Sequence, residues 1–173
     1  MKGLILTALI ATGALASSAQ ASVPTDIKVP EGNKAFLEAY AVGVQIYGCS
    51  ATASGYAWSL TGPRANLYTH GRLVATHFAG PTWQAKSGSK VVGARAAGVN
   101  VDPTAIDWLL LSAASTTPGR LGATTYIQRI HTSGGVAPAG GCDAGTSGAT
   151  VEVPYTADYV FFKARRGCHG RLD

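Results

Sequence analysis

Apolar and polar residues alternate with a period of two along most of the chain. The clearest case is TVEVPYTADYVFF (150–162), in which the odd-numbered residues from Val151 to Phe161 are apolar or tyrosine. Successive side chains of a strand point to opposite faces, so this pattern predicts a half-buried strand. Pro154 has no N–H to donate, which predicts an edge position or a bulge at that point.

Further segments of the same kind predict seven more strand stretches, at 39–47, 56–60, 64–68, 72–78, 82–85, 90–95 and 124–131. In the first of them, Val42, Val44 and Ile46 share one face. His70-Gly71 and Ser87-Gly88 mark turns, because glycine adopts positive φ at little cost.

The segment VDPTAIDWLLLSAA is ambiguous. Asp102-Pro103 is compatible with the start of a helix, whereas the run WLLLSAA fits a buried strand. We predict a short turn at 102–106 followed by a strand.

Many strands separated by turn signals indicate a β-sandwich or a barrel. We predict one all-β domain over 22–173, an antiparallel β-sandwich with little helix, with a β-barrel as the alternative. Residues 133–149, rich in Gly, Ala, Ser and Pro, form one long loop in this interpretation, and 164–173 form a frayed basic tail.

Residues 1–21 have the features of a signal peptide. Lys2 precedes an apolar stretch from Leu4 to Ala16, and Ala19-Gln20-Ala21 is a small-x-small cleavage pattern. The stretch is shorter than the roughly 20 residues that span a bilayer. We expect cleavage, a secreted or periplasmic location and no transmembrane segment in the mature chain; an uncleaved anchor is the alternative.

Export favours oxidation of the three cysteines, which allow one bridge and one leftover thiol. Cys49 follows a strand-like run and Cys142 lies in a glycine-rich loop, whereas Cys168 lies in the basic tail. We favour the pair Cys49–Cys142, while pairings that use Cys168 stay open. The spacing matches no zinc pattern.

Composition narrows the class of protein and the kind of partner further. Only 13% of the residues are charged, and 22 of 173 are glycine. Such a chain is neither disordered nor a coiled coil. The net charge is +5, but basic residues are spread out except for Arg165-Arg166, and aromatic residues do not interleave with them. We therefore expect no nucleic-acid partner, and instead an unknown small ligand or a cell-envelope component.

Catalytic signals are weak. The chain has no GxSxG, no P-loop and no GxGxxG after a strand, so we expect no cofactor and assign no catalytic residue firmly. His77 lies on the strand LVATHF, and His131 shares a face with Ile127 and Arg129. These two histidines are candidates for a general base or a metal site. No HxH or HExxH occurs, so we predict no metal.

The most distinctive stretch is THFAGPTWQ (76–84). His77, Trp83 and Gln84 could line a pocket for an apolar or sugar-like ligand. Alternatively, the Gly-Pro corner and Trp83 close one end of the fold with no ligand.

Six blocks resemble a secreted family of bacteria and fungi that is known only as a domain of unknown function. They are VGVQIYGC, HFAGPTWQ, VDPTAIDWLLL, STTPGRL, TTYIQRI and VPYTADYVFFK. The family pattern includes cysteines that match Cys49 and Cys142, so the resemblance supports that bridge. Some fungal members are labelled malate dehydrogenase, but this chain lacks a dinucleotide fingerprint and is too short for that enzyme's two domains.

Three hypotheses follow. The first is a non-enzymatic exported β domain that binds a ligand or a surface component. The second is a small extracellular hydrolase or metal-dependent enzyme that uses His77 and His131. The third is a structural envelope protein, which predicts no deep pocket.

Overall fold

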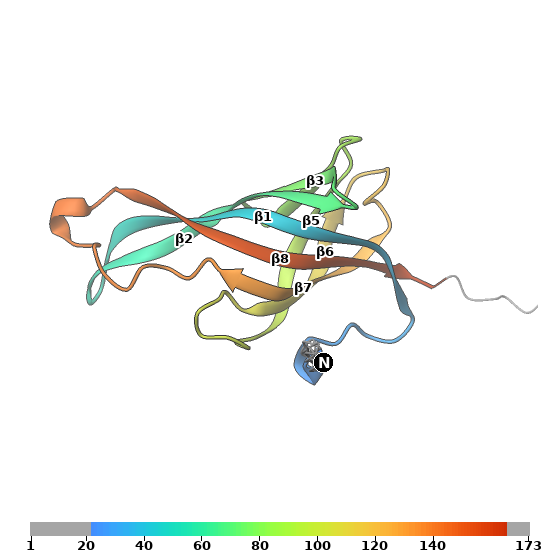
Figure 1. Cartoon of the computed structure of the whole chain (residues 1–173), viewed down its shortest axis with the longest axis horizontal. Coiled ribbons are helices and arrows are strands. Elements are labelled where there is room, and N and C mark those ends of the chain that lie inside the picture. Colours follow the sequence, from blue (N-terminus) through green and yellow to red (C-terminus); the bar gives the residue numbers. More distant parts are fainter. Residues whose placement is uncertain (1–21, 166–173) are drawn as a thin grey trace, which may run out of the picture.

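The computed structural model describes residues 22–165. The predicted signal peptide, Cys168 and the tail from residue 166 onward lie outside the described residues. The elements are η1 (Thr25–Ile27), β1 (Asn33–Thr52), β2 (Gly55–Thr69), β3 (Arg72–Phe78), β4 (Thr82–Ala85), β5 (Lys90–Val99), β6 (Trp108–Thr116), β7 (Thr124–Gly134), η2 (Ala144–Thr146) and β8 (Thr150–Ala164) (Figure 1).

All neighbouring strands are antiparallel, and together they form one closed barrel in the order β1 to β8. The all-β prediction is confirmed. The barrel, and not the favoured sandwich, is the arrangement found. The reason is that β1 pairs with both β2 and β8, from Asn33↔Ala164 to Gly48↔Thr150, which joins the two ends of the sheet.

Several local predictions are confirmed. The strands at 72–78 and 82–85 have the predicted bounds, and a turn over 102–106 precedes the strand β6. The stretches 56–60 and 64–68 form one strand, β2. Pro154 lies where β7 has ended opposite Tyr155, so that part of β8 pairs only with β1 and is an edge.

Small inward residues of β1 lie beside large inward residues of other strands. The inward positions of β1 include Ala39 and Ala41, whereas β8 contributes Tyr159 and Phe161, and β4 contributes Trp83. Gly43 has no room for a side chain, because a Cβ there would lie 2.2 Å from the backbone oxygen of Arg64. Such size matching is how narrow barrels fill their interior.

The face that we predicted from Val42, Val44 and Ile46 is the outer face of β1. Val42 is 48% exposed, while its neighbour Ala41 is fully buried. Alternation is therefore correct on β1, but its β-branched residues lie outside. The interior needs small residues there, because the aromatic side chains of β8 and β4 occupy the space.

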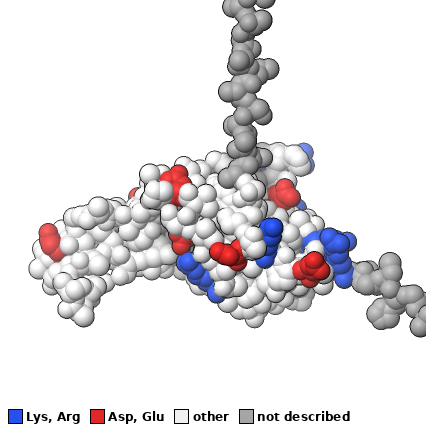
Figure 2. Space-filling model, turned by 90° about the horizontal axis from the view of Figure 1, so that it is seen from below, with Lys and Arg blue, Asp and Glu red and all other residues white. Residues whose placement is uncertain are grey.

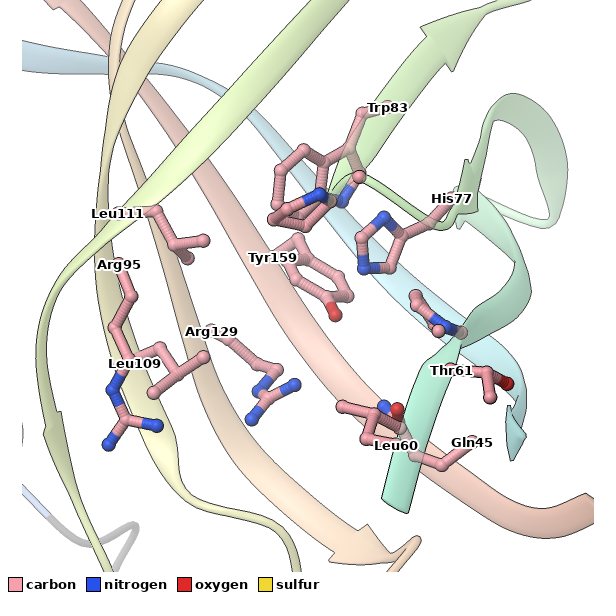
Figure 3. A pocket seen from close by; sticks show the side chains of 14 residues that line it. Gln45, Leu60, Thr61, His77, Trp83, Arg95, Leu109, Leu111, Arg129 and Tyr159 are labelled. Carbon is pink, nitrogen blue, oxygen red and sulfur yellow. The ribbon is translucent and has the colours of Figure 1, made fainter. Parts of the chain in front are cut away.

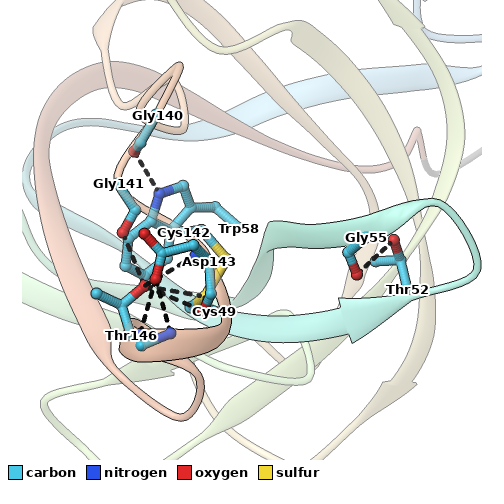
Figure 4. The surroundings of a disulfide bond; sticks show 10 residues. Cys49, Thr52, Gly55, Trp58, Gly140, Gly141, Cys142, Asp143 and Thr146 are labelled. Atoms are coloured by element: carbon cyan, nitrogen blue, oxygen red, sulfur yellow. Dashed lines mark hydrogen bonds between the residues drawn. A yellow bond between two sulfur atoms is a disulfide. The ribbon is translucent and has the colours of Figure 1, made fainter.

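One end of the molecule extends beyond the barrel. We call this part, formed by residues 47–60 and the start of β8 at 150–154, the arm (Figure 1). The disulfide Cys49–Cys142, which confirms the predicted pair, fastens the loop after β7 to the arm (Figure 4). Trp58 Nε1 adds a hydrogen bond of 2.9 Å to the Gly140 carbonyl.

The N-terminal segment packs on the outside of the barrel. Ile27 of η1 is fully buried in an outer apolar cluster with Trp108, Leu110 and Ile130. Gln128 Nε2 donates to the Ile27 carbonyl at 2.7 Å. Among residues 22–165 there is no helix with the length and apolar character needed to cross a membrane.

Candidate functional site

A cavity of about 330 Å³ lies inside the barrel, and all eight strands contribute residues to its lining (Figure 3). Its walls include His77, Trp83, Tyr159 and Arg129, and Leu60, which is 58% exposed, lies at its rim. Small-molecule sites in proteins start at about 300 Å³. The cavity therefore has room for one small organic molecule.

His77 and Trp83 form one wall of this cavity. They are opposite each other in the β3–β4 pair, and their rings stack with centroids 4.1 Å apart and planes 4° apart. The ring of Tyr159 meets both edge-on, at 5.3 and 5.4 Å. The stack holds the indole and the imidazole in fixed orientations beside the open space.

His77 is a neutral imidazole with a defined tautomer. Burial lowers the pKa of His77 to about 3; the charge of Arg129 acts in the same direction, and the bond to Thr82 opposes both. Nδ1 lies 2.9 Å from the Thr82 carbonyl, which can only accept. Nδ1 therefore carries the proton, and Nε2 is left as an acceptor.

Two buried polar atoms of residues that line the cavity, Gln45 Oε1 and Trp83 Nε1, have no hydrogen-bond partner within the described part of the chain. Gln45 is only 2% exposed and Trp83 only 1%. Leaving such a group unpaired costs about 1–3 kcal/mol. One is an acceptor and the other a donor, and both belong to side chains that line the cavity.

Arg129 brings positive charge to the same space. Its Nε and Nη2 atoms donate to the Asp107 backbone carbonyl at 3.0 and 2.8 Å. The Asp107 carboxylate is instead bonded to Arg95, at 3.1 Å, and to Asn100, at 3.2 Å. Although burial opposes ionisation, these two bonds hold the pKa of Asp107 below its ordinary value.

The sequence-predicted site residues are only partly brought together. His77 and Trp83 line the cavity side by side (Figure 3). Gln84 lies between the inward residues Trp83 and Ala85 of β4, so it faces the outside of the barrel and does not line this cavity.

His131 does not lie where the alternation pattern predicted. The pattern placed His131 on the same face as Ile127 and Arg129, and these two residues point inward. A β-bulge between Ile130 and Ser133, with His131 at φ 49°, reverses the direction of this side chain. His131 Nδ1 instead lies 2.8 Å from Asp158 Oδ2 on the outer face.

The two candidate histidines therefore lie on opposite faces of the barrel wall. His77 lines the internal cavity, whereas His131 lines a separate hollow of about 520 Å³ on the outside. Residues 22–165 contain no group of three His, Cys, Asp or Glu side chains placed to hold a metal ion.

Sequence reasoning did not select Gln45 or Arg129. The available signal was a polar side chain at an inward position of an otherwise apolar strand: Gln45 follows Ala39, Ala41 and Gly43 in the period-two pattern.

Residues 30–163 match the family described as "Protein of unknown function (DUF3455)". The chain belongs to the DUF3455 family. No curated protein and no solved structure matches it.

Replacing His77 with Phe should flatten the dependence of this DUF3455 protein's stability on pH. His77 takes up a proton near pH 6.5 in the unfolded chain but only near pH 3 in the folded chain. The stability that neutral His77 allows is therefore fully present above pH 6.5 and is lost as the pH falls toward 3. Between pH 7 and 4.5 this loss is about 2 kcal/mol for a group this buried. Urea denaturation at both pH values measures it. Equal losses of stability in H77F and in the wild type would contradict the low pKa of His77.

Replacing Gln45 with Leu should stabilise the DUF3455 barrel without ligand by about 1–2 kcal/mol, because an unpaired buried carbonyl is removed. Gln128→Leu is the matched control. Gln128 is also buried, but its amide donates to Ile27, so the same substitution should destabilise by about 1–2 kcal/mol. Thermal and urea denaturation measure the change in stability of both variants. Equal destabilisation by Q45L and Q128L would contradict the statement that Gln45 Oε1 lacks a hydrogen-bond partner.

Proposed function

We propose that this chain is an exported, non-enzymatic protein that binds a small molecule in the cavity of its barrel. The observation that carries the proposal is the pair of unpartnered buried atoms, Gln45 Oε1 and Trp83 Nε1, in side chains that line one cavity. Native proteins leave few buried polar groups unpaired, so each such group calls for an explanation, and a functional role is one of them.

The character of the wall supports binding of an organic molecule. Leu109, Leu111 and the rings of Trp83 and Tyr159 provide apolar surface, and a few polar groups lie among them. This combination is typical of sites that bind small ligands, in which apolar contact provides affinity and polar groups fix orientation.

The properties of His77 favour binding over acid–base catalysis. An efficient general base has a pKa near the working pH, whereas burial lowers the pKa of His77 to about 3. His131, the other candidate, faces a different hollow. The hydrolase hypothesis needed both imidazoles close together, so it loses its main support.

The charge distribution supports a small ligand over an envelope polymer. On the face shown in Figure 2, Lys and Arg side chains are interspersed with Asp and Glu, and most of the surface is uncharged. A polyanionic polymer would bind best to a continuous basic patch, which this face does not present.

Export is part of the proposal. The leader features of residues 1–21 support it, and the Cys49–Cys142 bridge is suited to an oxidising compartment. Expression in a bacterial host with the full leader should yield a periplasmic or secreted product whose N-terminus, by mass spectrometry, is Ser22. A product that stays in the cytoplasm with residues 1–21 attached would overturn this part.

Ligand binding should appear in a thermal-shift screen of a library of neutral and charged small molecules, because a molecule that binds only the folded state raises Tm. Leu60→Trp at the rim should narrow the entrance and reduce the shift given by each hit. Leu73→Trp is the matched control, since Leu73 is also exposed, at 40%, but does not line the cavity. The absence of any hit, or equal shifts in both variants, would overturn the proposal.

A further inference from the structure

Arg129 is only partly used by its own chain. A guanidinium group has five N–H donors. Two of the five bind the Asp107 carbonyl, and residues 22–165 provide no hydrogen-bond acceptor for the other three. The planar side chain is therefore held in place on one side and free to donate on the other.

The charge of Arg129 also lacks a direct partner. The described residues place no carboxylate within 4 Å of its guanidinium, and the carboxylate of Asp107, whose carbonyl it binds, is in a salt bridge with Arg95. None of the fourteen residues that line the cavity is acidic, while two are arginines. A half-buried cation in such surroundings favours a bound anion.

On the basis of the proposed function, we infer that the ligand is a small carboxylic acid with an apolar body, bound through its carboxylate to Arg129. In Figure 3 the guanidinium of Arg129 lies among the side chains of Tyr159, Leu109 and Gln45, which line the cavity with it. A carboxylate accepts two parallel N–H bonds from such a planar group.

The charge balance selects a carboxylate over a phosphate. Arg95 is 58% exposed and already paired with Asp107, so Arg129 is the one cation of the cavity wall without an ionic partner among the described residues. Arg129 balances one negative charge of a ligand. The second charge of a phosphate monoester would stay uncompensated beside apolar walls, which is costly.

The other polar groups refine this chemistry. His77 Nε2 is an acceptor on a side chain that lines the cavity, so it calls for an O–H or N–H on the ligand. The leucines and aromatic rings contact the apolar body. A hydroxylated aromatic acid combines all these features.

The experiment compares phenylacetate, 4-hydroxyphenylacetate and 2-naphthylacetate with their neutral amides, by isothermal titration calorimetry at pH 7. Each pair differs in charge but hardly in shape. We expect at least one acid to bind tenfold or more tightly than its amide. Arg129→Gln should remove this preference, and Arg129→Lys should keep part of it. Arg64→Gln changes net charge equally, but Arg64 is in an exposed ion pair with Glu152 and does not line the cavity, so this substitution should leave the preference unchanged.

Amides that bind as tightly as acids would overturn the inference while leaving the binding function intact. No binding in either series would also overturn it, and the broad thermal-shift screen then decides separately whether the cavity binds anything. Should R129Q fail to fold, the acid-to-amide ratio of the wild type, together with R129K, still decides.

Discussion

The pairing of β1 with β8 is the interaction on which the candidate site depends. It joins the ends of the sheet, so every inward side chain of eight strands must share one narrow interior. Small residues on β1 make room for the aromatic side chains of β8 and for Trp83. Where this filling stops, beside Arg129 and Gln45, a cavity remains.

Closure also decides what the polar groups of the interior can do. Inside the barrel they are shielded from water, so an unpaired donor or acceptor is costly and a hydrogen bond to a ligand is strong. The stacked pair His77 and Trp83 and the doubly bonded Arg129 are held in position before a ligand arrives. Preorganisation of this kind reduces the entropy lost on binding.

The candidate site was partly predictable. His77 and Trp83 are close in sequence and meet across one tight turn, so local pattern was enough to bring them together. Arg129 reaches the same cavity from β7 and Gln45 from β1, and these placements depend on strand pairings between distant segments. His131 shows the limit of alternation, because one bulge reverses the side of the sheet that a residue faces.

The sequence by itself determined the all-β class and most of the strands and turns, because alternation and glycine turns are local signals. It favoured the cysteine pair Cys49–Cys142 but left the pairings with Cys168 open. Only the tertiary structure decided that the sheet closes into a barrel, that the valines of β1 lie outside, and that Gln45 and Arg129 join His77 and Trp83 around one cavity. These outcomes depend on which strands pair across long separations and on how side-chain volumes share one interior, and neither is encoded in any single segment.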